Sequence, residues 1–449
     1  MQFKTKRFLT AFLPMLALLQ ACKKNDLSNN LNPSPTSGLS ASAIKDSAVS
    51  YSRDIYLWYN QIPANFNAQT YEDPNAVMEG IRQYSNEPGF STPVDKWSFA
   101  MKKTEWDNLS NGVSGDFGIN VFFFKEGDLR VTSVERSSPA GAAGVRRGWR
   151  ISKINGSTDI TTSNANFISN AVWNSSTGDF TFVKPDGSTV DLKLKSASYQ
   201  EHPVYLDSIY TINSKKIGYF SFNSFLGDTT ELYNEFARVF NGFAAAGITD
   251  LVVDLRYNGG GYVTVQEKLA NWLAPASASG QLMMKEQFND KYTQYNTTDY
   301  FQKLGSLNLP RIYFIVSHNT ASASELLINN LKPFLDVQLV GPSKTYGKPV
   351  GFFPIPASDW YIFPVSFRST NKNGQGNYFN GMDLNNQVAD GLDKDWGDIT
   401  ESCLQTVLSN ITTGAYQRST VRETIQMQSV NDVLAAPEFK GAIDIRKRK

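Results

Sequence analysis

The chain has 449 residues, a length typical of about two to four domains, and its 41% hydrophobic content is sufficient for several buried cores. Its 43 Lys and Arg residues are balanced by 42 Asp and Glu residues, which leaves no basic excess to displace counterions from phosphates, so we expect no nucleic-acid partner. Two histidines, His202 and His318, and two cysteines, Cys22 and Cys403, are too few for the ligand patterns of zinc sites, and we expect neither a metal nor a cofactor.

Residues 1–21 have the pattern of a secretory signal peptide. Basic residues at positions 4, 6 and 7 precede an apolar run over residues 8–19, which is shorter than the roughly 20 residues that a mature membrane-spanning helix needs. The run ends in Leu-Gln-Ala-Cys, which resembles the cleavage box of bacterial lipoproteins. We therefore expect Cys22 to carry lipid and to anchor the exported chain to a membrane of the bacterial cell envelope, facing the periplasm or at the outer membrane. The alternative is a plain signal peptide in which this cysteine is incidental.

Two further regions follow the expected lipidation site. Residues 22–42 are rich in Asn, Ser and Pro, which is the composition of a solvated tether. In residues 43–109, apolar residues recur at helical spacing, with Pro63 and Pro74 as breaks, and this predicts a small helical N-terminal module. If Cys22 carries lipid, Cys403 is the only free thiol of the exported chain. We therefore expect no intramolecular disulfide.

Residues 110–199, which we call the β domain, are expected to be compact and rich in strands. Short runs of strand-forming residues occur at 118–124, 129–134, 180–183 and 190–194, the last two joined by a Pro-Asp-Gly turn. Residues 138–156 contain Ser-Pro-Ala-Gly-Ala-Ala-Gly-Val, then Gly-Trp-Arg-Ile, then Ile-Asn-Gly. This element resembles that of PDZ domains, with Trp149 where Asp is usual.

The PDZ resemblance implies a peptide-binding role. A PDZ domain accepts an extended peptide as an added strand and captures its terminal carboxylate with backbone amides of the preceding loop. The residues expected to bind peptide here are Gly115, Phe117, Gly118 and Ile119. Two alternatives remain open: the domain is only a spacer, or Asp116 weakens the binding of a carboxylate by charge repulsion.

Strands and helices alternate over residues 200–412, which predicts an α/β core with partly parallel strands. The expected strands are 216–222, 251–255, 311–316 and 337–340, and the expected helices are 229–246 and 325–334. Residues 413–449 have only a weak helical pattern and end in four basic residues, so we expect a C-terminal tail.

Three segments of this α/β core could carry chemistry, since each follows a strand, where the sites of α/β folds open. The strand at 251–255 runs into glycines 259–261, whose amides can approach a ligand closely, although glycine turns after strands are common. Ser322 precedes a helix whose first amides could stabilise an oxyanion, but Ser-x-x-Glu at 322–325 is also a capping box, and the segment alone favours the cap. Residues 341–348 resemble a phosphate loop only superficially, because the glycine spacing is wrong and Pro349 replaces the magnesium-binding hydroxyl.

Together, these segments are similar to the signature of the carboxyl-terminal processing peptidases, tricorn-like serine proteases that carry a PDZ domain. The chain reads Asp-Leu-Arg-x-Asn-x-Gly-Gly from residue 254, Thr-Ala-Ser-Ala-Ser-Glu from residue 320, and Gly-Lys at 347–348. The resemblance covers roughly residues 109–410. Residues 55–59 and 95–99 also look like the lead-in module of lipoprotein members of this family.

The resemblance implies a fold and a set of site residues. The fold would be a helical N-terminal module, a PDZ-like β domain and an α/β protease core of the ClpP/crotonase type. Ser322 would be the nucleophile, Lys348 the general base and Glu325 the supporting acid. The amide of Ala323 and that of either Gly260 or Gly261 would be the oxyanion donors. The family's Gly-Ile-x-Pro-Asp element is replaced here by Gly-Met-Asp-Leu-Asn at residues 381–385, a departure whose effect would fall on the substrate channel.

We therefore expect a serine endopeptidase that hydrolyses envelope or exported proteins with a Ser/Lys dyad and recognises their C-termini through the PDZ-like domain. A lysine accepts a serine proton near neutral pH only when burial lowers its pKa by several units from about 10.4. Two alternatives stay open: a mechanism based on His318, four residues before the serine, and a silent or latent peptide-binding scaffold of the cell envelope. The substrate, the cleavage preference and the oligomeric state cannot be predicted.

Overall fold

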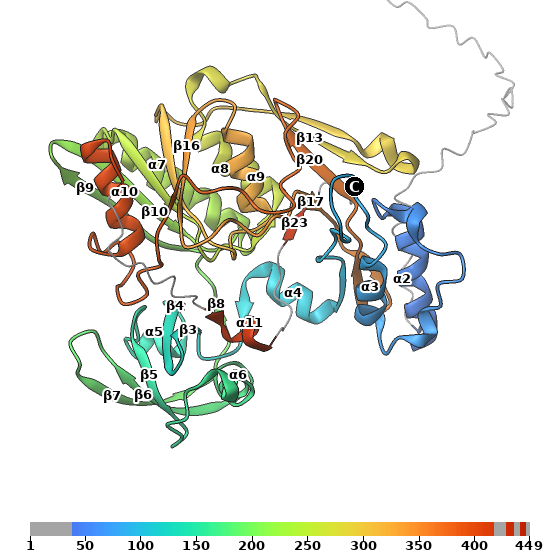
Figure 1. Cartoon of the computed structure of the whole chain (residues 1–449), viewed down its shortest axis with the longest axis horizontal. Helices are drawn as coiled ribbons and strands as arrows, with labels where there is room; N and C mark the ends of the chain where they lie inside the picture. Colours follow the sequence, from blue (N-terminus) through green and yellow to red (C-terminus); the bar gives the residue numbers. More distant parts are fainter. Residues whose placement is uncertain (1–37, 417–427, 435–440, 446–449) are drawn as a thin grey trace, which may run out of the picture.

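The computed structural model describes residues 38–416, 428–434 and 441–445. The expected signal peptide, Cys22, most of the expected tether and the basic end of the chain lie outside these residues. Figure 1 shows the N-terminal module in blue and the β domain in cyan to green, packed against different sides of the α/β core. No helix in the described ranges is long and apolar enough to cross a membrane.

The N-terminal module combines two helices with a strand that joins it to the α/β core. Its helices are α2 (Ala41–Ile55), capped by the Ser40 hydroxyl, and α3 (Pro74–Arg82), capped by the Asp73 carboxylate with Pro at the first helical position. Strand β1 (Phe99–Lys102) pairs with β19 (Trp360–Phe363), which in turn pairs with β18 (Ile355–Ala357). Helix α4 (Lys103–Asn111) then leads to the β domain. The module is therefore continuous with the core, because the two share a sheet and a hydrophobic cluster.

The β domain is an antiparallel sheet closed by short helices. Its strands are β3 (Ile119–Lys125), β4 (Asp128–Val134), β5 (Arg150–Ile154), β6 (Thr177–Val183) and β7 (Thr189–Lys195). Its helices are α5 (Pro139–Ala142) and α6 (Ala165–Trp173), and a two-stranded ladder of β2 (Val113–Ser114) and β8 (Tyr199–Gln200) closes its base. The predicted hairpin is confirmed as β6 and β7, paired from Thr177 to Lys195.

The α/β core is built on a six-stranded sheet with the order β21-β16-β15-β11-β10-β9. The strands are β9 (Val204–Ile212), β10 (Lys215–Phe222), β11 (Asp250–Asp254), β15 (Arg311–Ile315), β16 (Asp336–Gly341) and β21 (Asn386–Gln387). Only the β9–β10 pair is antiparallel, and the other pairs are parallel. The expectation of partly parallel strands is confirmed.

Helices cover both faces of this sheet. One face packs on α7 (Thr229–Ala246), α8 (Val263–Leu273) and α9 (Ala323–Leu331), and the other on α10 (Ser402–Thr413). Alternate residues of each strand enter the two cores: in β11, Val253 belongs to the first and Val252 to the second. The thiol of Cys403 is buried in this second core, under α10.

A second sheet and a glycine strand complete the core. The sheet has the order β14-β13-β20-β17, formed by β13 (Leu282–Phe288), β14 (Thr297–Tyr300), β17 (Val350–Gly351) and β20 (Phe367–Asn371). The glycine strand is β12 (Gly260–Tyr262), which follows β11 of the main sheet in the chain and directly precedes α8.

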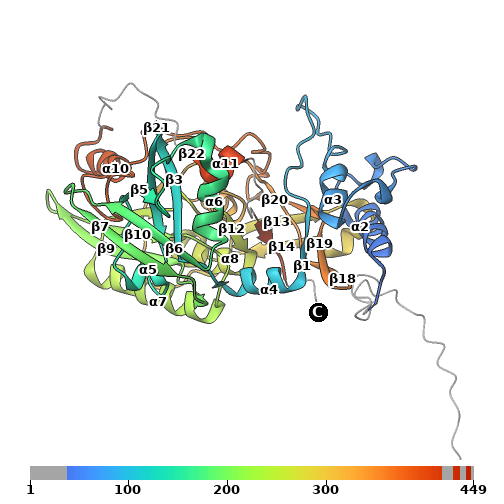
Figure 2. The same cartoon turned by 90° about the horizontal axis from the view of Figure 1, so that it is seen from below.

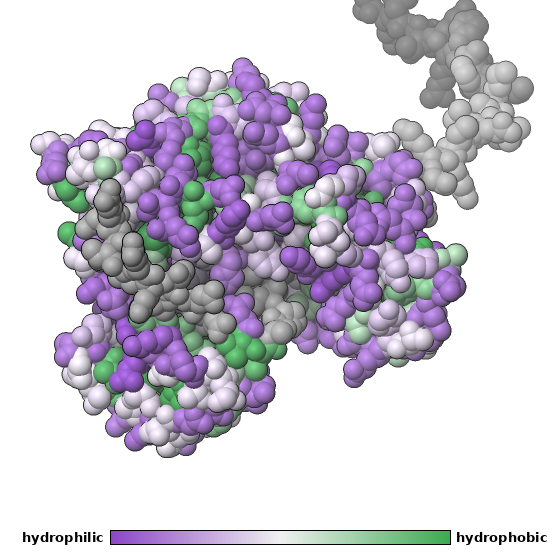
Figure 3. Space-filling model, in the orientation of Figure 1, coloured by the Kyte–Doolittle hydropathy of each residue, from purple (hydrophilic) through white to green (hydrophobic). Residues whose placement is uncertain are grey.

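Two described stretches near the end of the chain, residues 428–434 and 441–445, are packed into the molecule, and we call them the C-terminal segments. The first contains β22 (Gln428–Ser429), which pairs with β3, and α11 (Val430–Leu434). The second contains β23 (Gly441–Ile443), which pairs with β12. Val430 and Ile443 are fully buried. The face of the molecule in Figure 3 is mostly hydrophilic. Among the described large hydrophobic residues, only Ile209, Tyr300 and Ile399 are strongly exposed.

Candidate active site

The three segments singled out in the sequence meet at one edge of the main sheet. They follow β11, β15 and β16, which are adjacent parallel strands and therefore end at the same edge. The loop after β11 leads to Gly260, the loop after β15 to Ser322 and the loop after β16 to Lys348. The topology thus brings together residues that lie up to 88 positions apart in the chain.

Ser322 lies in a tight turn at the start of α9 and is 1% exposed. Its backbone has φ 59° and ψ −108°, a conformation that costs a non-glycine residue on the order of 1–3 kcal/mol. Its amide donates to Glu325 Oε2 at 2.8 Å, which is one half of the capping box. Its hydroxyl oxygen, in contrast, has no hydrogen-bond partner among the described residues. A buried hydroxyl held without a partner is available to a substrate.

The Glu325 carboxylate ties the serine turn to the lysine turn. Its Oε2 accepts the amides of both Ser322 and Lys348 at 2.8 Å, so these two nitrogens are no more than twice that distance apart. Its Oε1 accepts the Thr345 hydroxyl at 2.6 Å and the Gly347 amide at 2.7 Å. Burial raises the pKa of Glu325 above its ordinary value, although these four hydrogen bonds oppose the shift.

Lys348 is 1% exposed and its ammonium lies between aromatic rings. Its Nζ is 3.6 Å from the centroid of Phe352 and 5.9 Å from that of Trp97. Burial lowers the pKa of Lys348 well below its ordinary value, with the charges of Asp95 and Glu325 opposing the shift. Trp97 and Asp95 come from the N-terminal module, so this module forms part of the lysine pocket.

The glycine turn after β11 lies directly against the amide of Ala323. Gly260 and Gly261 have φ values of 105° and 141°, and a Cβ on Gly260 would lie only 3.0 Å from Ala323 N. Only glycine therefore fits at residue 260. The Gly260 amide donates to Asn258 Oδ1 at 2.9 Å and is directed into the turn.

A cluster of buried charges lies behind the glycine turn. Arg256, 1% exposed, donates to Asp254, Asp390 and Glu401, and its bonds to the last two measure 2.7 and 2.8 Å. Arg147 of the β domain binds the same Asp390 at 2.7 Å. Burial alone would raise the pKa of Asp390, but Arg256 and Arg147 hold it below its ordinary value.

Sequence reasoning quoted the motif that contains Asp254 and Arg256 but gave neither residue a role, and it missed Arg147 and Asp390. The signal it could have used is the presence of two charged residues at the end of an apolar strand, because charges in such positions are paired when they are buried. It also missed Asp95 and Trp97, whose approach to Lys348 depends on a contact over about 250 residues of chain that no local pattern indicates.

The residues expected to bind peptide in the β domain are divided by the structure. Gly115 is exposed, whereas the side chains of Phe117 and Ile119 are buried in the domain core, so those side chains cannot contact a peptide. The Gly118 amide donates to the domain's own Asp116 at 2.7 Å, and Asp116 also accepts the Tyr199 hydroxyl at 2.5 Å. An internal carboxylate therefore occupies an amide that the PDZ resemblance reserves for a peptide terminus.

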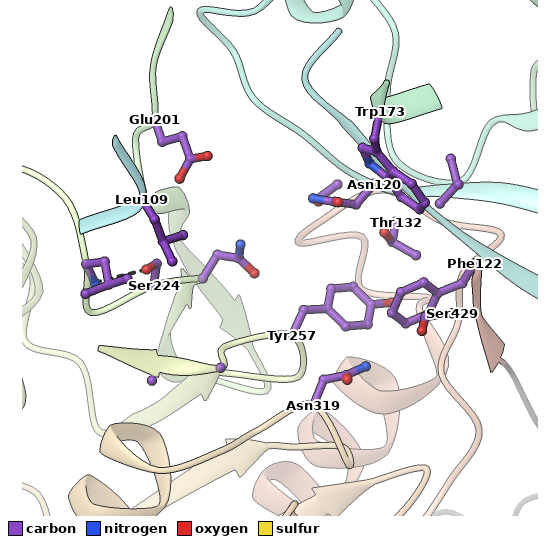
Figure 4. Close-up of a pocket in the computed structure, with 16 residues that line it drawn as sticks. Leu109, Asn120, Phe122, Thr132, Trp173, Glu201, Ser224, Tyr257, Asn319 and Ser429 are labelled. Atoms are coloured by element: carbon purple, nitrogen blue, oxygen red, sulfur yellow. Dashed lines mark hydrogen bonds between the residues drawn. The ribbon is translucent and has the colours of Figure 1, made fainter. Parts of the chain in front are cut away.

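A cavity of about 380 Å³ lies between the β domain and the glycine turn. Figure 4 shows Asn120, Phe122, Thr132 and Trp173 on the β-domain side, facing Tyr257 and Asn319 of the core across it. Gly259, Gly260 and Ser429 also line it. The cavity therefore reaches the glycine turn that offers an oxyanion donor, but neither Ser322 nor Lys348 lines it.

The two histidines are engaged elsewhere. His318 Nε2 is 3.1 Å from Asp432 Oδ2 in α11, and His202 Nδ1 is 2.6 Å from Glu231 Oε1. In the described ranges, no group of three or more His, Cys, Asp or Glu side chains is arranged to hold a metal ion.

Comparisons with known proteins show which proteins the chain is similar to. The model of peptidase family S41 matches residues 216–381, and that of the peptidase S41 N-terminal domain matches residues 44–99. A Staphylococcus aureus protein described as a probable CtpA-like serine protease is 28% identical over 260 residues, which are 57% of this chain and 49% of that protein. A Staphylococcus saprophyticus protein with the same description is 25% identical over 257 residues. The chain thus spans about half the length of the curated relatives it matches.

A solved structure supports the same fold. The crystal structure of a candidate S41 protease from Bacteroides fragilis superposes with a TM-score of 0.67 at 24% identity, covering 82% of this chain and 97% of that one. The family models and the solved structure thus both support an N-terminal domain ahead of an α/β core. Two family models and the curated relatives therefore agree that the chain is similar to serine peptidases of family S41.

Proposed function

We propose that the chain is a serine endopeptidase in which Ser322 and Lys348 are the catalytic pair. One observation carries this proposal: a single buried carboxylate, Glu325, accepts the backbone amides of both residues. Beside it, the Ser322 hydroxyl has no hydrogen-bond partner among the described residues, and burial lowers the pKa of Lys348. Such an arrangement presents a nucleophile and a neutral base to one substrate.

The proposed chemistry is acyl transfer. Neutral Lys348 accepts the Ser322 proton as the serine oxygen attacks a peptide carbonyl, and the lysine then protonates the departing amine. Water, deprotonated by the same lysine, attacks the acyl-enzyme and releases the second product, which regenerates the serine. Glu325 acts as a positioning residue, since it holds the two turns together through backbone amides.

The oxyanion donors are assigned to the amides of Ala323 and Gly261. Ala323 follows the nucleophile at the start of α9, where the helix dipole also favours negative charge. Of the two glycines that the sequence leaves open, Gly260 already donates to Asn258, which leaves the amide of Gly261 as the better candidate. Removing one such donor costs about 10²- to 10³-fold in kcat in serine proteases.

The experiment is cleavage of an unstructured protein with an apolar C-terminus by residues 23–449, measured across about pH 6–10 to span a lowered lysine pKa. The native sequence is compared with Ser322→Ala and Lys348→Ala. Cleavage that is lost in both variants supports the proposal. Cleavage that persists in Ser322→Ala contradicts it.

A second candidate function is a latent enzyme or a peptide-binding scaffold of the cell envelope. It is favoured by the position of the second C-terminal segment, which contacts the glycine turn through the β12–β23 pair. Covalent labelling of Ser322 by a fluorophosphonate distinguishes an enzyme, active or latent, from a scaffold. A scaffold without an activated serine would not react under any condition.

The physiological setting is also proposed. Substrates would be envelope or exported polypeptides whose C-termini are recognised by the β domain, and Cys22 would attach the enzyme to a membrane of the cell envelope through lipid. Incorporation of radiolabelled palmitate into the native chain but not into Cys22→Ser tests the anchor. A truncated substrate that lacks its apolar C-terminus tests the recognition step, because the KM for it should rise.

A further inference from the structure

The second C-terminal segment lies as an added strand between two parts of the proposed active site. On one side, β23 pairs in parallel with β12, with Gly441 opposite Gly260 and Ala442 opposite Gly261, and the Gly441 amide donates to Gly259 O at 3.1 Å. On the other side, the Phe352 amide donates to Ala442 O at 3.0 Å. Figure 1 shows β23 in dark red beside β17. The segment therefore bridges the glycine turn and the strand that follows Lys348.

The carbonyl of Gly441 lies beside the proposed oxyanion donors. The position of a Cβ on Gly260 is 2.3 Å from Gly441 O and 3.0 Å from Ala323 N, so these two atoms are no more than 5.3 Å apart. In a parallel ladder of this register, the amide that faces the Gly441 carbonyl is that of Gly261. A main-chain carbonyl of the chain itself thus faces the Gly261 amide and lies within 5.3 Å of the Ala323 amide nitrogen, the two donors assigned to the reaction's oxyanion.

The side chains that follow Gly441 are buried, and that of Ile443 packs in the cluster that flanks Lys348. Ala442 is 4% exposed, and Ile443 is fully buried. Ile443 belongs to the same hydrophobic cluster as Trp97 and Phe352, whose rings flank Lys348. The segment therefore contributes a strand backbone and apolar side chains to the site, as an extended peptide substrate would.

The first C-terminal segment occupies the edge of the β domain in the same way. In β22, Ser429 pairs antiparallel with Phe122 of β3, whose other edge is taken by β4. Figure 2 shows β22 beside β3 and α11 beside α6. Val430 is fully buried in the core of the β domain. This is the mode by which an extended peptide augments an exposed sheet edge.

The first segment also contacts the loop that carries the nucleophile. The Ser429 hydroxyl caps α11 by accepting the Asp432 amide at 2.8 Å, and Asp432 pairs with His318, four residues before Ser322. The hydrogen bond from His318 lowers the pKa of Asp432 to about 2 against the opposing effect of burial. The histidine that the sequence offered as a base thus binds the chain's own C-terminal segment.

We propose that the C-terminal segments are an internal pseudosubstrate: residues 441–445 occupy the track on which a substrate main chain binds at Ser322, and residues 428–434 occupy the peptide edge of the β domain. A polypeptide substrate must displace them, and it binds as a parallel strand against β12 with small and branched apolar residues entering the lysine pocket. This inference rests on the proposed function, because it assigns the substrate track to that site. The fraction of molecules with the segment displaced then limits the apparent affinity for any substrate.

The test uses residues 23–449 carrying Ser322→Ala, so that binding is measured without cleavage. The probe is a fluorescent peptide with the sequence of residues 441–445, Gly-Ala-Ile-Asp-Ile. Ile443→Asp should release the strand by burying a charge, and Ile399→Asp is the matched control because Ile399 is 48% exposed. A chain ending at Leu434 is the second variant, since it removes β23 without a substitution in the core.

We expect the probe to bind the Ile443→Asp chain and the shortened chain at least about tenfold more tightly than the native chain and the Ile399→Asp control. Equal binding by all four, or binding by none, overturns the proposal. With Ser322 restored, the two released forms should cleave the unstructured substrate with a kcat/KM at least about tenfold higher. If the binding pattern appears but no form cleaves any substrate, the proposed function fails and the occupancy of the track stands.

Discussion

Two buried charged clusters at one edge of the main sheet show opposite uses of burial. At Arg256, Asp254 and Glu401 each charge has an opposite partner at hydrogen-bond distance, and Arg147 adds a second cation that binds Asp390. At Lys348 the ammonium faces the rings of Phe352 and Trp97, and burial lowers its pKa. The difference teaches that opposite charges make a buried charge structural, whereas desolvation that lowers the pKa of a buried amine prepares it to act as a base.

Replacing the cation in each cluster by methionine is the sharpest way to break this comparison. Lys348→Met should reduce kcat/KM by at least about 10⁴-fold, because the proton acceptor is lost. Its free energy of unfolding should be unchanged or higher, since a desolvated amine gives way to an apolar chain of similar length. Steady-state kinetics and urea unfolding measure the two effects, and a strong loss of stability would contradict the expectation that burial of this amine is unfavourable.

Arg256→Met should have the reverse signature. It leaves the carboxylates of Asp254, Asp390 and Glu401 buried near one another, and breaking a buried pair in this way costs about 3–5 kcal/mol. The free energy of unfolding from urea denaturation at pH 7 measures this loss. A matched triple exchange of the carboxylates to their amides in the Arg256→Met chain should recover part of it.

A pH series separates the contribution of Lys348 to stability from that of Arg256. Because the folded-state pKa of Lys348 is lowered, the unfolded chain binds more protons between that pKa and about 10.4, so this group makes the stability rise with pH across that window. The difference in unfolding free energy between the native chain and Lys348→Met should therefore shrink as pH rises from 7 to 10. Activity should rise as the pH passes upward through the same lowered pKa, since only neutral lysine is a base.

The smallest effect concerns the strained serine. Because Ser322 has a positive φ, Ser322→Gly should be more stable than Ser322→Ala by about 1 kcal/mol, although both are inactive. Thermal unfolding of the two variants side by side measures the difference. Equal stability would mean that the turn relaxes in the variants and that no strain is held in the native loop.

Much of the fold could be predicted from local sequence patterns. The alternation of strands and helices identified β10, α7, β11, β15 and α9, and the hairpin β6–β7 followed from its Pro-Asp-Gly turn. The convergence of Gly260, Ser322 and Lys348 was also predictable, because loops that follow adjacent parallel strands meet at one edge. These features depend on short stretches of chain, each with its own periodicity or turn chemistry.

The rest depends on contacts that no local pattern encodes. Asp95 and Trp97 reach the lysine pocket only because β1 pairs with β19, more than 250 residues away. Arg147 meets Asp390 across 243 positions of chain. Strand β23 has only three residues, and nothing in its composition separates it from a tail. The capping interaction predicted between Ser322 and Glu325 is present at the start of α9, where the Ser322 amide donates to Glu325 Oε2.

The buried thiol of Cys403, a residue of α10, has a practical consequence for labelling experiments. Burial raises the pKa of Cys403 well above its ordinary value, so the thiol is both inaccessible to maleimides and poor as a nucleophile. In a chain of residues 23–449, Cys403 would therefore give no background signal when introduced cysteines are labelled with maleimides. A pair of introduced cysteines, one at Ile445 and one on α4, could therefore carry two spectroscopic labels in an otherwise native sequence. Their separation in solution would report directly, molecule by molecule, how often the end of the chain leaves the core.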